Sequence, residues 1–120
     1  MDLRPLQELA DQQTAARAAA RDFARRVREA LGERIEWIRL YGSLARGDWM
    51  GPDESDVDVA VVVREKTEAD VRLVLSLAGE QLLRDGFVFS PRVFAPEEFQ
   101  RLIDRELRLG RDILEEGVLL

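Results

Sequence analysis

The chain has 120 residues, of which 46% are hydrophobic and 35% are charged, and its formal net charge at pH 7 is −6. This balance excludes a disordered chain, and a chain of this length is expected to form a single domain over residues 1–120. Acidic residues exceed basic ones in both halves of the sequence, so the basic field that nonspecific nucleic-acid binding requires is missing, and nucleic acid is not an expected partner.

The N-terminal part of the chain is expected to be one long helix. Apolar and small residues recur at helical spacing over residues 5–31, Pro5 suits a first helical turn, and Gly32 suits a stop. The N-terminus lacks a basic segment followed by an apolar one, and no apolar run approaches the ~20 residues that a bilayer crossing needs. We therefore expect a cytoplasmic protein with a helical segment over residues 1–33, followed by a core over residues 35–120.

Two strands separated by a polar loop are expected next. Residues 35–41 are rich in branched and aromatic side chains and run into a Gly-Ser turn, which predicts a strand that ends at the turn. Residues 47–55 are polar and contain a Gly-Pro-Asp sequence, which predicts a loop. Residues 57–63 are apolar on both sides of a period-2 pattern, which predicts a central strand covered on both faces.

The second half of the chain is expected to contain three helices and one strand. The helices are predicted over residues 67–85, 96–106 and 111–116, and the strand over residues 87–94. Pro91 inside this strand favours an edge position or a bulge, because proline cannot donate to a neighbouring strand. The order helix, strand, strand, helix, strand, helix, helix predicts an α+β fold, a small mixed β-sheet with helices packed against it.

The first segment that carries chemistry lies at the end of the first predicted strand. Gly42 permits close backbone approach, and a short helix beginning near Ser43 would present N–H groups to a phosphate, with help from the serine hydroxyl. Arg46 could add a charge-assisted contact to the same anion. A Gly-Ser pair after a strand is most often only a turn, so this signal is weak on its own.

The second segment lies at the start of the next predicted strand. Asp56 and Asp58 are two residues apart, so on a strand they point to the same face with Cα atoms roughly 6.6 Å apart. The chain has no cysteine and no histidine, so any metal must be held by oxygen, and carboxylates shared with substrate phosphates are typical of magnesium sites. Alone, the two acids could simply be exposed on a strand edge, but in a buried valine-rich strand they would be costly without a partner, and a cation is a natural one.

Together the two segments resemble the minimal nucleotidyltransferases of the DNA polymerase β-like superfamily, whose signature is Gly-Ser followed by Asp-x-Asp in a hydrophobic strand. The resemblance is close over residues 40–48 and 55–62, looser over residues 89–99 and 113–119, and extends over residues 35–120 as a whole. It implies the nucleotidyltransferase fold of the polymerase β-like type.

The resemblance also implies a reaction and a set of roles. Gly42 and Ser43 would hold a nucleoside triphosphate, ATP or another NTP, and Arg46 would contact it. Asp56 and Asp58 would be the catalytic residues and would bind Mg²⁺ or Mn²⁺. The implied reaction is attack on the α-phosphate with release of pyrophosphate, and two ions about 4 Å apart are suited to such a displacement.

One feature departs from the family pattern. Active relatives commonly carry a third carboxylate on a later strand, whereas residues 87–94 contain no acid and place Arg92 near the expected position. Asp48, Asp53 or Asp85 could substitute if a loop or helix end folds inward.

This gap leaves two functions open. The chain could be an enzyme that transfers AMP from ATP to a protein hydroxyl, or a nucleotidyltransferase-fold binding module that neutralises a partner by complex formation. For both, the resemblance implies the same partner, a small helical HEPN-type ribonuclease toxin, with the chain as its antitoxin.

Two further features have structural and functional interpretations. The first helix carries an arginine stripe that could meet an acidic partner, made of Arg17, Arg21, Arg25 and Arg28. The pairs Asp22–Arg26 and Arg25–Glu29 favour instead a solvated surface. Trp37 is expected in the core, whereas Trp49, in the polar loop, is a candidate for stacking on a base.

Overall fold

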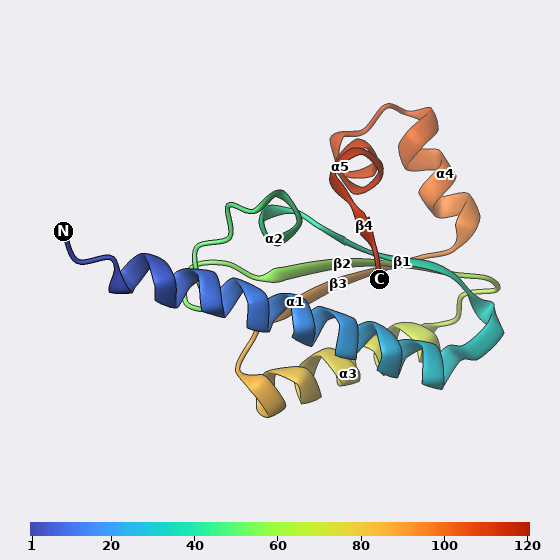
Figure 1. Cartoon of the computed structure of the whole chain (residues 1–120). Helices are drawn as coiled ribbons and strands as arrows, with labels where there is room; N and C mark the ends of the chain where they lie inside the picture. The colour runs from blue at the N-terminus through green and yellow to red at the C-terminus, as the bar shows by residue number, and fades with distance from the viewer.

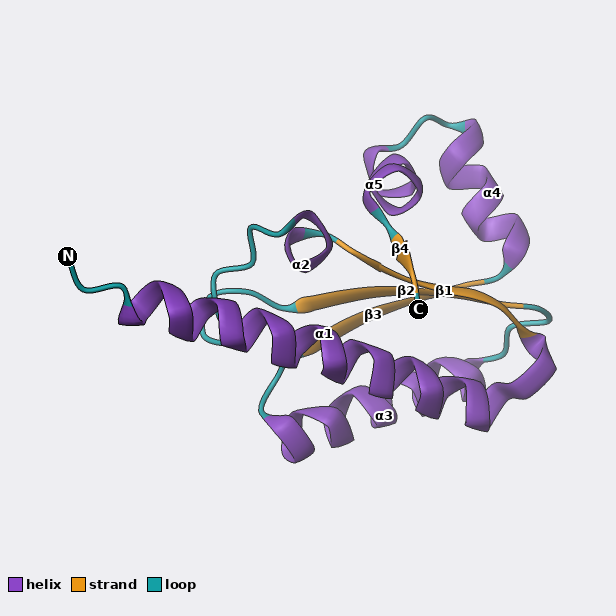
Figure 2. Cartoon of the chain, in the orientation of Figure 1, coloured by secondary structure: helices purple, strands orange, loops and turns teal.

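The computed structural model describes residues 1–120, in which four strands form one sheet and five helices surround it (Figures 1 and 2). The elements in chain order are α1 (Arg4–Leu31), a 3₁₀ turn (Gly32–Arg34), β1 (Ile35–Tyr41), α2 (Ser43–Arg46), β2 (Val57–Val63), α3 (Glu68–Asp85), β3 (Phe89–Phe94), α4 (Pro96–Asp104), α5 (Arg108–Glu116) and β4 (Val118–Leu119). None of the helices combines the length and apolar character that crossing a membrane would take.

The sheet is mixed, with the strand order β3-β2-β1-β4. β1 pairs antiparallel with β2 and with β4, and β2 pairs parallel with β3. The α+β fold with a small mixed sheet is therefore confirmed, as is the central position of β2. The strand β4 was not predicted, because two residues are too few to show a periodic pattern.

Helices cover the two faces of the sheet separately. α1 and α3 lie on one face, and α4 and α5 lie on the other (Figure 1). Alternate residues of β2 belong to two cores, with Val57, Val59, Val61 and Val63 facing α1 and α3, and Ala60 and Val62 facing α4 and α5. β2 is thus buried on both faces, which explains its nearly continuous apolar sequence.

The predicted edge position of β3 is confirmed, and its outer edge is shielded. The Val57 N–H donates to the carbonyl of Val88, so the parallel register turns the backbone groups of Pro91 and Val93 toward the free edge. Pro91 has no N–H to offer there, and the Lys66 ammonium donates to the Val93 carbonyl at 3.3 Å.

The C-terminal helices differ from their predicted limits. α4 ends at Asp104 instead of near Glu106, and α5 begins at Arg108 instead of Arg111. The turn between them places Glu106 in a left-handed conformation with φ 53°, and a Cβ at Gly110 would lie 3.0–3.1 Å from Leu102 and Ile103. α5 therefore packs closely against α4 at Gly110, within the turn of helix that lies before the predicted start.

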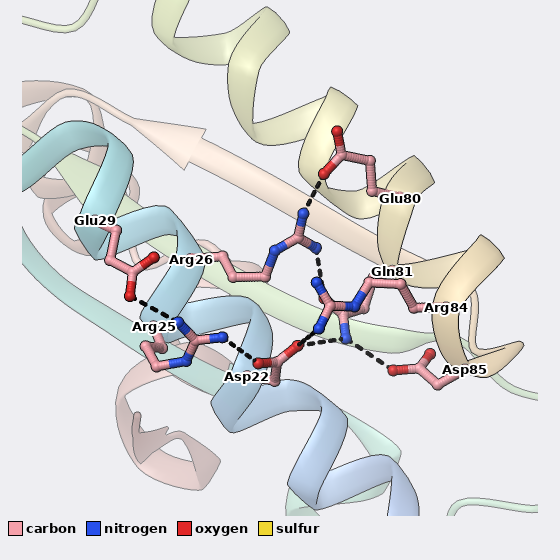
Figure 3. A network of polar contacts seen from close by, with 8 residues as sticks. All are labelled: Asp22, Arg25, Arg26, Glu29, Glu80, Gln81, Arg84 and Asp85. Atoms are coloured by element: carbon pink, nitrogen blue, oxygen red, sulfur yellow. Dashed lines mark hydrogen bonds and ion pairs between the residues drawn. The ribbon is translucent and has the colours of Figure 1, made fainter.

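A polar network joins α1 to α3 at the surface (Figure 3). The expected Arg25–Glu29 pair is present at 2.6 Å, but the expected Asp22–Arg26 pair is not formed. Asp22 instead binds Arg25 at 2.7 Å, and Arg26 reaches across to Glu80 and Gln81 of α3. The prediction of the Asp22–Arg26 pair was wrong because α3 supplies partners that the local sequence spacing does not reveal.

A buried carboxylate fixes the start of α3. Asp70 accepts two hydrogen bonds from the Arg34 guanidinium at 2.6 and 2.7 Å, and it completes a capping box with Thr67. The hydrogen bonds from Arg34 are the main reason that the pKa of Asp70 falls from 3.8 to about 2. Asp70 thereby ties α3 to the turn that precedes β1.

We expect Asp70→Asn to lower the free energy of unfolding at pH 7 by about 2 kcal/mol, because one pKa unit corresponds to about 1.4 kcal/mol. The folded-state pKa is depressed, so the wild-type advantage should be complete above about pH 4 and should disappear as the pH falls toward 2. Urea denaturation of both proteins between pH 7 and pH 2 measures this difference. Glu68→Gln, at an exposed position of the same helical turn, serves as the control and should change little. A difference that does not change with pH would contradict the assignment.

Candidate active site

The Gly-Ser segment forms a sharp turn between β1 and the short helix α2. Gly42 has φ 75° and ψ −156°, a combination that only glycine adopts readily, and Ser43 is the first residue of α2. Leu44 is buried and anchors this helix in the core. The predicted short helix beginning near Ser43 is confirmed.

The Gly42 turn lies directly against Asp58. In the antiparallel register Asp58 is opposite Tyr41, the residue that precedes the glycine. A Cβ atom at Gly42 would overlap the Oδ2 atom of Asp58 and would lie 3.2 Å from its Cγ. Any side chain at position 42 would therefore displace the carboxylate, so glycine is required both by the backbone and by its neighbour.

The two aspartates lie at the entrance of β2. Asp58 is the second residue of the strand and is half-buried, whereas Asp56 precedes the strand by one residue and is exposed. Burial is the largest cause that raises the pKa of Asp58, and the charge of Asp56 raises it further. The structure thus brings the two carboxylates close enough to repel each other.

Arginines partly offset this negative charge. The charges of Arg92 and Arg46 both act to lower the pKa of Asp58. Arg46 forms ion pairs with Glu116 of α5 at 2.9 Å and with Asp48 at 3.3 Å. Arg46 therefore lies within electrostatic reach of Asp58 and is held there by Glu116 of α5.

Tyr41 also lies at the candidate site, although no motif of the sequence includes it. Its pKa is raised mainly by burial and also by the charge of Asp58, and the guanidinium of Arg92 opposes this shift. The alignment of Tyr41 with Asp58 depends on the strand register. The only signal in the sequence was the position of Tyr41 immediately before the Gly-Ser turn.

No third acidic side chain joins Asp56 and Asp58, since no three acidic residues of the chain are grouped as metal ligands would be. Asp48 pairs with Arg46, and its side chain is 65% exposed. Asp85 accepts hydrogen bonds from Gln81 and from the Phe87 N–H at the end of α3. β3 carries no acid, and neither Asp48, Asp85 nor Asp53 of the exposed loop takes the place of a third carboxylate beside Asp56 and Asp58.

The proposed stacking role of Trp49 was wrong. Trp49 is fully buried, lies edge-on to Phe87 with ring centroids 5.8 Å apart, and belongs to the core under α1. Gln13 of α1 donates to the Trp49 carbonyl at 2.9 Å, so helix and core together fix the loop that leads to Asp56. Trp37 is half-buried and packs edge-on against Phe99, in agreement with the prediction that it belongs to the core.

The site lies partly at the surface, where Asp56 is exposed and Asp58 is half-buried. None of Gly42, Ser43, Asp56 and Asp58 lines a surface hollow. The hollow beside α1 is lined by Arg21, Ala24, Arg25, Arg28, Glu29 and Leu120. A glycine turn, paired carboxylates and an arginine thus converge on an accessible end of a central strand. Such an arrangement can bind a phosphate chain together with a cation.

The four-stranded mixed sheet with helices on both faces places the chain in the α+β class. The family described as nucleotidyltransferase domain matches residues 21–119, and the chain belongs to that family of transferases.

Relatives and a solved structure agree with the family. Two proteins of Methanocaldococcus jannaschii, each named "putative protein adenylyltransferase", are 33% and 27% identical to the chain. The alignments span 85% and 78% of this chain and 94% and 93% of the relatives. A crystal structure titled as a putative nucleotidyltransferase from Sulfolobus solfataricus has the same fold, with a TM-score of 0.58 and 20% identity over 92% of this chain and 84% of that one.

We expect Gly42→Ala to destabilise the fold by more than Gly47→Ala, which also replaces a glycine of positive φ but meets no atom within 4 Å. Backbone strain alone costs about 1–2 kcal/mol, and the overlap with Asp58 should add about 1–3 kcal/mol. In an Asp58→Ala background the overlap is removed, so the cost of Gly42→Ala should fall. Thermal denaturation of the single and double variants measures the coupling, and strictly additive effects would show that the two residues do not press on each other.

Proposed function

We propose that the chain transfers a nucleoside monophosphate, AMP from ATP, to a hydroxyl group of another protein. The observation that carries the proposal is the contact of Gly42 with Asp58, because it joins the phosphate-binding turn to the paired carboxylates. Membership of the nucleotidyltransferase domain family and the names of the two archaeal relatives support the reaction type. The exposed position of Asp56 suits a large acceptor that approaches from the surface.

Asp56 and Asp58 would hold a divalent cation, Mg²⁺ or Mn²⁺. The donor set fits such an ion, because carboxylate oxygens are the ligands it prefers and triphosphate oxygens and water complete its shell. Burial and the neighbouring charge of Asp56 both disfavour the ionised form of Asp58 and raise its pKa. A bound cation would stabilise the ionised carboxylate. When bound, the ion would neutralise charge on the phosphates during transfer.

Gly42, Ser43 and Arg46 would bind the triphosphate. The first amides of a helix have no carbonyl partner within it, and the glycine lets a phosphate approach them closely. The Ser43 hydroxyl would add a hydrogen bond, and Arg46, which already lies beside Asp58, would add a charged one.

In the proposed reaction the oxygen of the acceptor hydroxyl forms a bond to the α-phosphorus of ATP. The bond from that phosphorus to the oxygen bridging the β-phosphate breaks, and its electron pair leaves with pyrophosphate. The hydroxyl proton passes to water, because no third carboxylate is available to accept it. General-base help is typically worth about 10²–10⁴-fold, so transfer should be slow.

The resemblance to minimal nucleotidyltransferases suggests the acceptor, a HEPN-type helical ribonuclease toxin that the chain would inactivate as an antitoxin. A second candidate function is a binding module that neutralises the same partner by complex formation. The missing third carboxylate favours this alternative.

Mn²⁺ with ATP should raise the melting temperature, because a ligand that binds only the folded state stabilises it by about 2.7 kcal/mol at 100 times its dissociation constant. Asp58→Ala should abolish the metal-dependent part of the increase. Asp53→Ala, which removes an exposed acid from the neighbouring loop, should keep it. An unchanged increase in Asp58→Ala would show that the metal binds elsewhere.

Labelled ATP, Mg²⁺ and the HEPN partner should give slow transfer of AMP to the partner, detected as an added mass. Arg46→Ala should reduce the rate about 10-fold or more by removing a charged phosphate contact, and Asp58→Ala should abolish transfer. A tight complex without any added mass, together with nucleotide binding, would favour the binding module instead.

A further inference from the structure

A row of polar side chains crosses the sheet at the candidate site. On the face toward α4 and α5, the register places Tyr41 opposite Asp58 and Asp58 opposite Ser90. The next pair on this face joins Ala60 to Arg92. Ala60 carries only a methyl group. The side chain of β2 that lies opposite Arg92 therefore leaves space between Arg92 and Asp58.

Arg92 differs from the other arginine of the site. Arg46 is committed to ion pairs with Glu116 and Asp48, whereas Arg92 is exposed and forms no ion pair. Arg92 follows Ser90 by two residues on β3, and Ser90 lies opposite Asp58, so Arg92 and Asp58 are on the same face of the sheet one register step apart. A guanidinium free of carboxylate partners thus lies within electrostatic reach of the proposed cation ligands.

We propose that Arg92 takes the place of a second divalent cation, so that the site holds one cation at Asp56 and Asp58 and binds the triphosphate oxygens with the Arg92 guanidinium. This inference rests on the proposed function. Two observations on β3 support it: the strand offers no acid that could bind a second cation, and it carries a positive charge that would repel one. A guanidinium is suited to the task, because its planar donors match phosphate oxygens in pairs.

The number of Mn²⁺ ions bound per nucleotide tests this assignment without reference to activity. The full chain is titrated with Mn²⁺ in the presence of saturating α,β-methylene-ATP, and free Mn²⁺ is counted by electron paramagnetic resonance. The wild type should bind one Mn²⁺ per bound nucleotide. Arg92→Asp, which restores an acid to β3 and removes the positive charge, should bind two.

Arg72→Asp is the matched control, since it makes the same change of charge at an exposed position on α3, which covers the opposite face of the sheet. It should bind one Mn²⁺, like the wild type. Two ions in the wild type, or one in a folded Arg92→Asp protein, would overturn the assignment of Arg92.

Arg92→Ala provides a second test that needs no new metal site. It should keep one Mn²⁺ per nucleotide and weaken nucleotide affinity about 10-fold, whereas Arg92→Lys should recover part of the loss. An unchanged affinity in Arg92→Ala would overturn the assignment while leaving the proposed function intact. A wild-type chain that binds neither Mn²⁺ nor nucleotide would overturn both.

Discussion

The contact between Gly42 and the carboxylate of Asp58 is the constraint on which the site depends. It can form only if β1 and β2 are antiparallel in the observed register, with Tyr41 opposite Asp58. That register is fixed in turn by the two apolar faces of β2, because a slip by one residue would exchange the sides of all its valines. The packing of the two apolar faces of β2 thus determines where the Gly-Ser turn meets Asp58.

The electrostatic environment of Asp58 is unfavourable for its charged form. A half-buried carboxylate with a like charge nearby lowers stability, and the raised pKa of Asp58 reflects that cost. Asp70 is more deeply buried than Asp58, yet it has full partners in Arg34 and Thr67. Asp70 at the start of α3 is thus a hydrogen-bonded acid with a structural role, whereas Asp58 in β2 has no such partner, in keeping with the binding role proposed for it.

Most of the fold could be predicted from the sequence, because the helices and strands have clear apolar repeats and their ends carry glycine, proline or capping residues. The errors arose where tertiary contacts decide. Trp49 lies in a polar loop, and only the packing of α1 over that loop buries it. Arg26 leaves its expected partner because α3 approaches from 54 residues away in sequence.

The candidate site divides in the same way. The Gly-Ser and Asp-x-Asp segments are local patterns, and the structure brings them together as the spacing suggested. The positions of Tyr41 and Arg92 depend on the strand register, and that of Glu116 depends on the return of the chain toward β1. Neither the register nor the return can be read from a local sequence pattern.

The shielded edge of β3 has a consequence for how the protein can assemble. With Pro91 and the Lys66 contact on that side, an extended segment of another molecule cannot continue the sheet there by backbone pairing. Intermolecular growth of the sheet, whether functional or as the start of aggregation, is blocked at β3. A partner that approaches β3 from this side must therefore be recognised through side chains. The shape and charge of the partner's surface then decide whether it binds, and an unpaired strand is not sufficient.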